Sequence, residues 1–365
     1  MEDTRIYSMS QETIVVGMSG GVDSAVAALL LRDQGLRVLG VFMKNWEEEA
    51  DDGACTATAD YEDVRRVCDA LGVPYYTVNF ARQYWDRVFE HFLSEYRAGR
   101  TPNPDVLCNR EIKFRELLDT AARLGDGRLA TGHYARVERR DGRYALLKGA
   151  DGDKDQSYFL YMLTQPQLSR AVFPLGALRK AQVRALAAQA GLNVAQKKDS
   201  TGICFIGERR FKEFLQRYLP AQPGPMRTLD GREVGRHDGL MYYTPGQRKG
   251  LGIGGGGTGE PWFVVGKDLA HNTLYVSQGE PPELFAGHCR LEEMTFCAGR
   301  PPAQAFDCMA KVRYRQSDQA ARVTLNDEGA LVEFAQPQRA MAAGQSVVLY
   351  DGDECIGGGI IAGNA

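Results

Sequence analysis

The N-terminal half of the chain alternates short apolar runs with stretches in which apolar residues recur three and four positions apart. The runs have the length of buried strands, and the stretches between them have the periodicity of amphipathic helices. The predicted strands are 14–16, 37–43, 73–80 and 129–136, and the predicted helices are 25–31, 61–71, 83–96, 110–124 and 178–190. This alternation predicts an α/β fold with a doubly wound parallel sheet.

The pattern changes after about residue 209, where a short predicted helix at 211–219 precedes turns marked by Asp-Gly pairs. Beyond Pro281-Pro282, alternating short strands predict a small β-barrel. A hairpin is also predicted at 137–147, turned at Asp141-Gly142. We therefore expect three domains, an α/β domain at 1–208, a β-rich central domain at 209–282 and a barrel at 283–365.

Composition and charge exclude some classes of protein. The chain has 365 residues, of which 44% are hydrophobic and 25% charged, and this is ordinary for a soluble globular protein. A net charge of −3 argues against a protein that coats nucleic acid, although it permits a local basic groove. The longest apolar run, 25–31, is too short to span a membrane, and the polar residues 1–11 lack the apolar core of a signal peptide, so a cytoplasmic location is expected.

The first predicted loop is a candidate nucleotide site. Ser19-Gly20-Gly21-Val22-Asp23-Ser24 follows the first strand and opens a helix, whose N-terminal N–H groups attract phosphate. The loop lacks the Lys-Ser/Thr ending of a Walker A sequence. The candidate ATP-binding residues are Gly17, Met18, Ser19, Gly20, Gly21, Val22, Asp23 and Ser24, with Met43 and Gly132 at later strand ends. Asp23 is a candidate magnesium ligand. A plain glycine turn with a capping Ser or Asp is the alternative, and Met43 could equally be core.

Two of the eight cysteines have surroundings that favour reactivity, and none of the eight forms a C-x-x-C pair. Cys108 lies just before the predicted helix 110–124, where the helix dipole and two nearby cations would lower a thiol pKa. Asp105 could exchange protons with a substrate, although an inert cysteine beside a capping loop is the alternative. Cys204 lies in a Ser/Thr/Gly-rich loop flanked by lysines, where a thiol is accessible and prone to ionise.

Two further features permit both a structural and a functional interpretation. His133 follows a predicted strand end and could be a structural histidine or a substrate contact. Lys311, Arg313 and Arg315 alternate with apolar residues, which predicts three cations on one strand face. Such a row could track phosphates, but a solvated outer face is the commoner meaning.

Taken together, motifs along nearly the whole chain resemble the bacterial tRNA-specific 2-thiouridylases, a family within the PP-loop ATP pyrophosphatases. The motifs are the Ser-Gly-Gly-Val-Asp-Ser loop, Asn103-Pro104-Asp105-Val106-Leu107-Cys108-Asn109, Gly132-His133-Tyr134-Ala135-Arg136, Lys154-Asp155-Gln156-Ser157-Tyr158, Lys198-Asp199-Ser200-Thr201-Gly202-Ile203-Cys204-Phe205, Tyr243-Thr244-Pro245-Gly246-Gln247-Arg248-Lys249-Gly250-Leu251-Gly252 and Arg313-Tyr314-Arg315-Gln316. The first loop is shared by many adenylylating enzymes, so the two cysteine segments carry the resemblance.

The resemblance implies a tRNA-uridine 2-sulfurtransferase that adenylylates O2 of the wobble uridine with ATP and magnesium and then replaces the oxygen with sulfur. Cys204 would carry a persulfide, Cys108 would form a disulfide with it, and Asp105 would be the acid/base. The implied tRNA contacts, partly from the barrel, are Asn103, Pro104, Asp105, His133, Lys154, Asp155, Gln156, Arg313, Tyr314 and Gln345. The implied partners are lysine, glutamate and glutamine tRNAs and a cysteine desulfurase or sulfur-relay protein.

Two rival functions remain open from the sequence. One is another adenylylating enzyme, such as an argininosuccinate-synthetase-like or amidating ligase, which would use the loop on a small metabolite and would not need Cys108 and Cys204. The other is a non-catalytic tRNA-binding or sulfur-carrier protein. It would bind RNA without releasing pyrophosphate from ATP.

Overall fold

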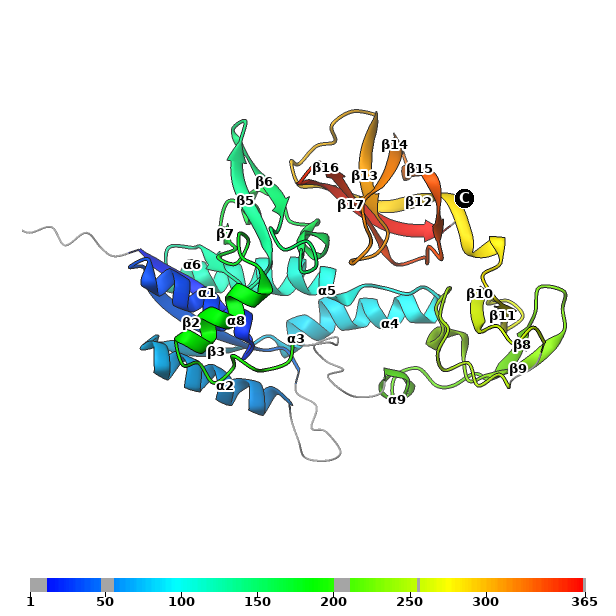
Figure 1. The fold of residues 1–365 in the computed structure, drawn as a ribbon, viewed down its shortest axis with the longest axis horizontal. Coiled ribbons are helices and arrows are strands. Elements are labelled where there is room, and N and C mark those ends of the chain that lie inside the picture. The colour runs from blue at the N-terminus through cyan, green and yellow to red at the C-terminus, as the bar shows by residue number, and fades with distance from the viewer. Residues whose placement is uncertain (1–11, 47–55, 200–210, 255–256, 364–365) are drawn as a thin grey trace, which may run out of the picture.

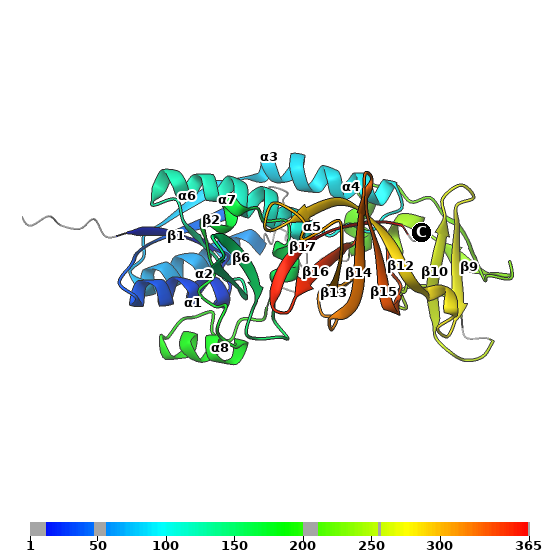
Figure 2. The same cartoon turned by 90° about the horizontal axis from the view of Figure 1, so that it is seen from above.

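The computed structural model describes residues 12–46, 56–199, 211–254 and 257–363. In these residues an α/β layer, a barrel and a small central sheet lie roughly in a row (Figure 2). The helical segment 81–97 runs from the α/β layer, beneath the barrel, towards the central sheet (Figure 1). Among the described residues, no helix is both long and apolar enough to cross a membrane.

The N-terminal sheet is parallel and has the strand order β3-β2-β1-β4-β7. Its strands are β1 (Thr13–Met18), β2 (Arg37–Lys44), β3 (Tyr75–Asn79), β4 (Leu129–Ala130) and β7 (Ala171–Val172). Side chains of β1 alternate between two cores, because Ile14 and Val16 pack on one face while Val15 packs on the other. Both faces are therefore covered, and the predicted doubly wound sheet is confirmed.

Helices cover the two faces of this sheet. The face of Ile14 packs against α1 (Val22–Asp33), α2 (Thr56–Leu71) and α8 (Lys180–Gln189). The other face packs against two segments in which α-helix and π-helix alternate without a break. These are α3 (Ala81–Tyr84), η1 (Trp85–Phe89) and α4 (Glu90–Arg97), and then α5 (Pro104–Leu107), η2 (Cys108–Leu117) and α6 (Leu118–Leu124).

The helix that carries Cys108 begins earlier than the sequence pattern predicts. The Asn103 side chain accepts a hydrogen bond from the Asp105 backbone N–H at 3.2 Å, and Pro104 occupies the first helical position. An Asn cap followed by proline is a strong helix start, because it satisfies an otherwise unpaired N–H and presets the backbone angle. The predicted helix start at 110 was therefore wrong, and Cys108 lies within the helix.

A hairpin links the α/β layer to the barrel. The hairpin consists of β5 (Ala135–Arg140) and β6 (Arg143–Lys148), and Asp141 and Gly142 at its turn both have positive φ. This is the type I′ geometry that suits the twist of a two-residue hairpin, so the predicted turn is confirmed. Short helical segments follow it, η3 (Ser157–Leu160), α7 (Gln165–Leu168) and, past α8, α9 (Phe211–Gln216).

The C-terminal half is β-rich, as predicted. The central sheet has the order β10-β11-β8-β9, and the barrel closes because β12 pairs with both β15 and β17. The central elements are β8 (Gly224–Arg227), β9 (Glu233–His237), η4 (Leu240–Tyr242), β10 (Trp262–Asp268), β11 (Thr273–Gln278) and η5 (Pro282–Leu284). The barrel strands are β12 (Phe285–Phe296), β13 (Ala305–Lys311), β14 (Gln319–Asn326), β15 (Gly329–Arg339), β16 (Ser346–Asp351) and β17 (Glu354–Gly363).

The predicted row of three cations on one strand face was wrong. Strand β13 ends at Lys311, so Arg313 and Arg315 lie in the connection to β14, where both are exposed. Lys311 itself is buried, and its Nζ lies 3.6 Å from Asp318 Oδ1 and 3.8 Å from Asp155 Oδ2. Alternation along the sequence produces a common face only while the backbone stays extended, and here the strand stops.

Lys311 is expected to stabilise the junction between the barrel and the α/β layer. Asp155 is buried and belongs to the segment before η3, so Lys311→Met would leave this carboxylate without its nearby cation. We expect the free energy of unfolding to fall by about 3 kcal/mol, as for other buried ion pairs that lose one partner. Denaturant unfolding would measure the loss. Arg322→Met, which removes an exposed ion pair with Asp307 on the outside of the barrel, is the control and should change stability little. Equal effects of the two variants would contradict the expectation.

Candidate functional site

Two serines fix the shape of the loop between β1 and α1. Ser24 Oγ accepts a hydrogen bond from the Ser19 backbone N–H at 3.1 Å and donates to the Gly21 carbonyl at 3.2 Å. Gly21 is the residue before the first turn of α1 and has an extended backbone, with φ −99° and ψ 165°. The loop therefore presents the N-terminus of a 12-residue helix, the kind of terminus that attracts an anion.

Two glycines are needed because backbone segments meet at this loop. Gly20 has φ +75°, and a β-carbon there would lie 2.6 Å from the Asp60 carbonyl oxygen of α2. A β-carbon on Gly132, which follows β4, would lie 2.8 Å from both the Asp23 carbonyl carbon and the Ser24 nitrogen. Gly132 thus lets its strand-end loop pack against the first turn of α1. A nucleotide contact at Gly132 stays a prediction.

The carboxylate of Asp23 is held by a lysine that the sequence analysis did not single out. Lys180 Nζ lies 2.8 Å from each Asp23 carboxylate oxygen, and the Tyr134 hydroxyl donates to Oδ1 at 2.7 Å. The same ammonium lies 2.8 Å from Asp199 Oδ1. Lys180 is the first residue of α8, far from the loop in sequence, and only the packing of α8 beside α1 brings the two together.

More cations surround the loop, and each is paired with acidic groups. Asp199 also accepts from Lys154 Nζ at 2.7 Å and from Arg184 Nη2 at 2.9 Å. Burial would raise the pKa of Asp199, but hydrogen bonds from Lys154 and Lys180 outweigh it and lower the pKa to about 2. Lys197 donates to the Gly20 carbonyl at 3.0 Å and to Asp60 and Asp63 at 2.7 Å each.

The residues around Asp23 do not form a metal cage of their own. Both Asp23 oxygens already accept from an ammonium, which would repel a divalent cation placed beside them. In the described part of the chain, no cluster of three or more His, Cys, Asp or Glu side chains could hold a metal ion. These side chains therefore suit a carboxylate paired with an ammonium and do not fit a resident magnesium ion.

The surroundings of Cys108 are more enclosed than the sequence pattern indicates. Cys108 is only 2% exposed and packs in the core that covers one face of the sheet. Arg110 pairs with Glu111 at 3.0 Å, and Lys113 Nζ lies 3.4 Å from His133 Nε2. The two expected cations thus have partners other than the thiol, and a lowered Cys108 pKa stays a prediction. Cys204 lies outside the described residues, so its proximity to Cys108 is not tested.

Asp105 sits one helical turn before Cys108, with its side chain half-buried. Burial raises the pKa of its carboxyl, and the nearby Lys113 ammonium offsets part of that rise. A carboxyl whose pKa is raised is protonated at a higher pH than usual, which is a property of side chains that exchange protons with substrates.

His133 has the geometry of a structural residue. It is 8% exposed, its Nδ1 lies 2.7 Å from the Thr131 hydroxyl, and its ring packs on Phe114 and Phe173. Burial and the Lys113 ammonium lower its pKa well below the usual range, so the imidazole is neutral. Of the two interpretations that the sequence leaves open, this environment favours the structural one, while a substrate contact stays untested.

The predicted tRNA contacts lie where the barrel meets the α/β layer. Gln345 Nε2 donates to the Thr101 carbonyl at 2.6 Å, beside Asn103 and Pro104. Tyr314 packs on Phe159 with ring centroids 4.5 Å apart, and its hydroxyl donates to the Lys154 carbonyl at 3.3 Å. Tyr314 and Gln345 of the barrel half therefore each contact a segment that is distant from them in sequence.

Two of these candidates have internal roles that the sequence does not indicate. Asp155 is 5% exposed and accepts hydrogen bonds from the backbone N–H groups of Gly149 and Ser157 at 3.0 and 3.1 Å. This environment gives the Asp155 side chain a structural role, and a tRNA contact at Asp155 stays a prediction. Gln156 Oε1 accepts from the Tyr134 backbone N–H at 3.0 Å, so this side chain fixes the loop that carries Tyr134.

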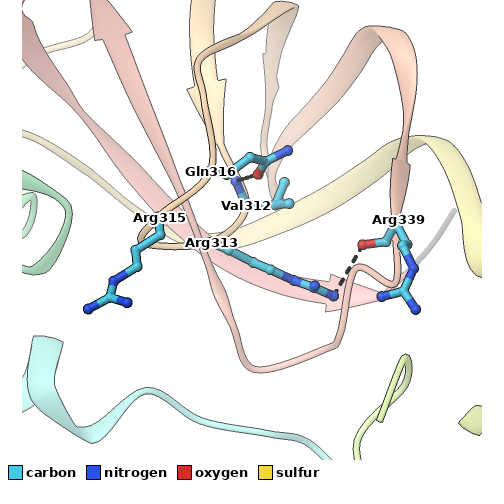
Figure 3. Close-up of a pocket in the computed structure, with 5 residues that line it drawn as sticks. All are labelled: Val312, Arg313, Arg315, Gln316 and Arg339. Atoms are coloured by element: carbon cyan, nitrogen blue, oxygen red, sulfur yellow. Dashed lines mark hydrogen bonds between the residues drawn. The ribbon is translucent and has the colours of Figure 1, made fainter. Parts of the chain in front are cut away.

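A cationic depression of about 350 Å³ lies on the barrel side of the junction (Figure 3). It is lined by Val312, Arg313, Arg315, Gln316 and Arg339. Arg313 is exposed as a whole residue, but its Nη2 donates to the carbonyls of Arg339 and Ala340 at 3.2 and 2.9 Å. Partial burial of this guanidinium and the nearby Arg339 guanidinium lower the pKa of Arg313. The exposed Arg315 and the two clustered guanidiniums give this surface the chemistry that attracts a phosphate.

Comparison with known proteins decides the family. A family model described as tRNA methyl transferase HUP domain matches residues 12–208. Models described as tRNA methyl transferase PRC-barrel domain and aminomethyltransferase beta-barrel domain match residues 212–278 and 286–361. The tRNA-specific 2-thiouridylase MnmA 2 of Geobacillus kaustophilus is 61% identical over 350 residues, which cover 95% of this chain and 94% of that protein. The chain belongs to the tRNA-specific 2-thiouridylase family.

Other 2-thiouridylases match to the same extent. The MnmA proteins of Shouchella clausii and Enterococcus faecalis are both 59% identical, and the matches cover 99% and 96% of this chain and 97% and 96% of the relatives. Among solved structures, the U34-tRNA thiolase NcsA from Methanococcus maripaludis aligns with 53% of this chain and 62% of its own, at 18% identity and a TM-score of 0.34. The family assignment rests on the 2-thiouridylases and not on this weaker likeness.

The close contact at Gly132 generates a prediction. In Gly132→Ala, the added methyl group would have to displace the backbone of Asp23 and Ser24, so we expect the free energy of unfolding to fall by about 1–3 kcal/mol. Denaturant unfolding would measure this loss. The control is Gly152→Ala, because a β-carbon there would meet no atom within 4 Å and the backbone does not have positive φ. If the two variants were equally stable, the packing role assigned to Gly132 would be incorrect.

Proposed function

We propose that this protein is a tRNA-uridine 2-sulfurtransferase that converts the wobble uridine, U34, to 2-thiouridine at the expense of ATP. The observation that carries the proposal is the 61% identity with a tRNA-specific 2-thiouridylase over nearly the full length of both chains. The loop at the N-terminus of α1 and the acid at Asp105 supply groups that such a reaction needs.

The first step is adenylylation of the uridine. The loop from Gly17 to Ser24 binds the phosphates of ATP at the N-terminus of α1. Asp105 takes the N3 proton of the uridine while O2 attacks the α-phosphate, and the bond from the α-phosphorus to the bridging oxygen breaks to release pyrophosphate. The step converts a carbonyl oxygen, which is a poor leaving group, into the oxygen of AMP.

The second step transfers sulfur. The terminal sulfur of a Cys204 persulfide attacks C2, and AMP leaves with the former O2. The Cys108 thiolate then attacks the Cys204 sulfur, so a disulfide forms and the sulfur stays on C2 as 2-thiouridine, with a proton returned to N3. A thiol reductant must reduce the disulfide before the next cycle, and a cysteine desulfurase or relay protein reloads Cys204.

The three domains have different roles in this proposal. The domain at 1–208 binds ATP and carries out catalysis, the domain at 209–282 links the other two, and the domain at 283–365 contacts tRNA. The substrates are lysine, glutamate and glutamine tRNAs. Magnesium is expected only as the counter-ion of ATP, and Met43 is the residue expected to contact the nucleotide base. The clustered guanidiniums of Arg313 and Arg339 support a phosphate contact beside Tyr314 and Gln345.

The two cysteines provide the decisive test. Nucleoside mass spectrometry of tRNA incubated with protein, ATP, magnesium and a persulfide source should show a sulfur-for-oxygen mass shift on wobble uridine. The shift is expected to vanish in Cys204→Ala and to fall at least about a hundredfold in Cys108→Ala, because each variant removes one of the two thiols that the transfer uses. Cys308→Ala, in barrel strand β13, is the matched control and should retain activity.

The rival functions give different results in the same assay. Full thiolation activity in Cys204→Ala would contradict the proposed persulfide step. Wild-type protein that splits ATP to AMP with a small metabolite but leaves tRNA unchanged would favour a ligase. Binding of tRNA without pyrophosphate release would favour a non-catalytic protein.

Asp105 predicts a pH dependence. A base must be ionised to accept the N3 proton, so the single-turnover rate should rise with pH through the Asp105 pKa. Because burial raises that pKa, the acid limb should lie above the usual aspartate value of 3.8. Asp105→Asn should lower the rate by about 10²- to 10⁴-fold and remove the limb. Asp119→Asn, at an exposed position of α6, is the control, and an unchanged limb in Asp105→Asn would assign it to another group.

A further inference from the structure

Lys180 occupies an unusual position beside the phosphate-binding loop. It is the first residue of α8, its backbone N–H donates to Asp151 Oδ2 at 2.8 Å, and its side chain is 12% exposed. The ammonium lies 2.8 Å from three carboxylate oxygens, two of Asp23 and one of Asp199. An ammonium has three N–H donors, so these three oxygens satisfy it fully.

We propose that Lys180 is the residue that neutralises the β- and γ-phosphates of ATP, and that Asp23 and Asp199 hold its ammonium in place until the nucleotide arrives. The inference rests on the proposed ATP-dependent function and names a phosphate-binding residue within that site. On nucleotide binding, phosphate oxygens replace carboxylate oxygens around Nζ. No bond is made or broken in this exchange.

The loop itself has no cation for this task. In Walker A loops a lysine at the end of the motif reaches the β- and γ-phosphates, but here Val22-Asp23-Ser24 stands in that region. Asp23 places a negative charge in the first turn of α1, and a triphosphate adds several more. Close approach of the two would be unfavourable unless a cation lies between them.

Of the described cations that contact the loop, Lys180 is the better placed. Lys197 donates to the Gly20 carbonyl and to two carboxylates of α2, so it fastens the loop to that helix. Lys180 instead contacts Asp23, in the first turn of α1, where the anion-binding N–H groups are. In both overall views α8 lies close to α1 (Figures 1 and 2), and the two helices are in contact.

The two carboxylates can release Lys180 without becoming isolated. Asp199 keeps Lys154 at 2.7 Å and Arg184 at 2.9 Å, and Asp23 keeps the Tyr134 hydroxyl at 2.7 Å. A carboxylate left with no partner in a partly buried site would oppose the exchange. Because these partners remain, the free-energy cost of the exchange is lower. The arrangement therefore suits an ammonium that moves from carboxylate to phosphate oxygens.

The test compares the affinities of ATP and AMP, measured by calorimetry, in four variants of the full chain. Lys180→Met should weaken ATP binding by about tenfold or more, with AMP binding changed less than about threefold, because AMP lacks the β- and γ-phosphates. Lys180→Arg should restore most of the ATP affinity. Asp199→Asn should tighten ATP binding, because it removes a competitor for Lys180. Lys212→Met, which breaks an ion pair with Asp238 in the region of α9, is the control and should leave both affinities unchanged.

The sign of the Asp199 effect separates this proposal from a structural ion pair. If Lys180 only held α8 against α1, both Lys180→Met and Asp199→Asn would weaken ATP and AMP binding alike, and that result would overturn the proposal. Unchanged ATP affinity in Lys180→Met would also overturn it. If the wild-type protein binds ATP through Lys180 but does not thiolate tRNA, this inference is supported and the proposed function is refuted. Absence of ATP binding in wild type would refute both.

Discussion

The contact between the loop after β4 and the first turn of α1 is the constraint on which the rest of the site depends. Gly132 allows the two backbones to meet, and Tyr134, two residues later, can then donate its hydroxyl to Asp23 at 2.7 Å. Gln156 holds the Tyr134 backbone in turn, and Lys180 approaches the same carboxylate from α8. This single close contact between backbones therefore fixes three parts of the site relative to one another. They are the loop between β1 and α1, the residues just before β5, and the start of α8.

A second set of contacts fixes the segment that carries Asp105 and Cys108 against the barrel. Gln345 Nε2 donates to the Thr101 carbonyl, just before this segment, and the Tyr158 hydroxyl of η3 donates at 2.9 Å to the carbonyl of Ser346, the first residue of β16. The helix start at Asn103 is therefore held by its own cap and, two residues earlier, by the barrel. Polar bonds of buried groups are directional, so they define the relative position of two domains more narrowly than apolar packing alone.

Local patterns predicted the sheet, the hairpin and the barrel, because each depends on periodicity or turn chemistry that the sequence shows directly. The start of the helix at Pro104 could also have been predicted, since Asn103-Pro104 is a capping sequence, but the helix was predicted to begin only at 110. Lys180 could not be found in this way. Its partners Asp23 and Asp199 are distant in sequence, and nothing in Leu178-Arg179-Lys180 distinguishes a site lysine from a solvated one. Arg313 and Arg315 were misplaced because alternation does not reveal where a strand ends.

The pairing of cations with carboxylates explains how a chain with net charge −3 can bind polyanions. Around the loop, Lys180, Lys154, Arg184 and Lys197 all contact acidic side chains, so the site holds its cations in place without a large positive field. Binding of a polyphosphate is then an exchange of one set of oxygens for another. Side chains already ordered by carboxylates lose little further entropy on binding, whereas solvated lysines would have to be immobilised. The net free energy comes from the difference between phosphate and carboxylate as partners, which favours ligands with several phosphates over those with one.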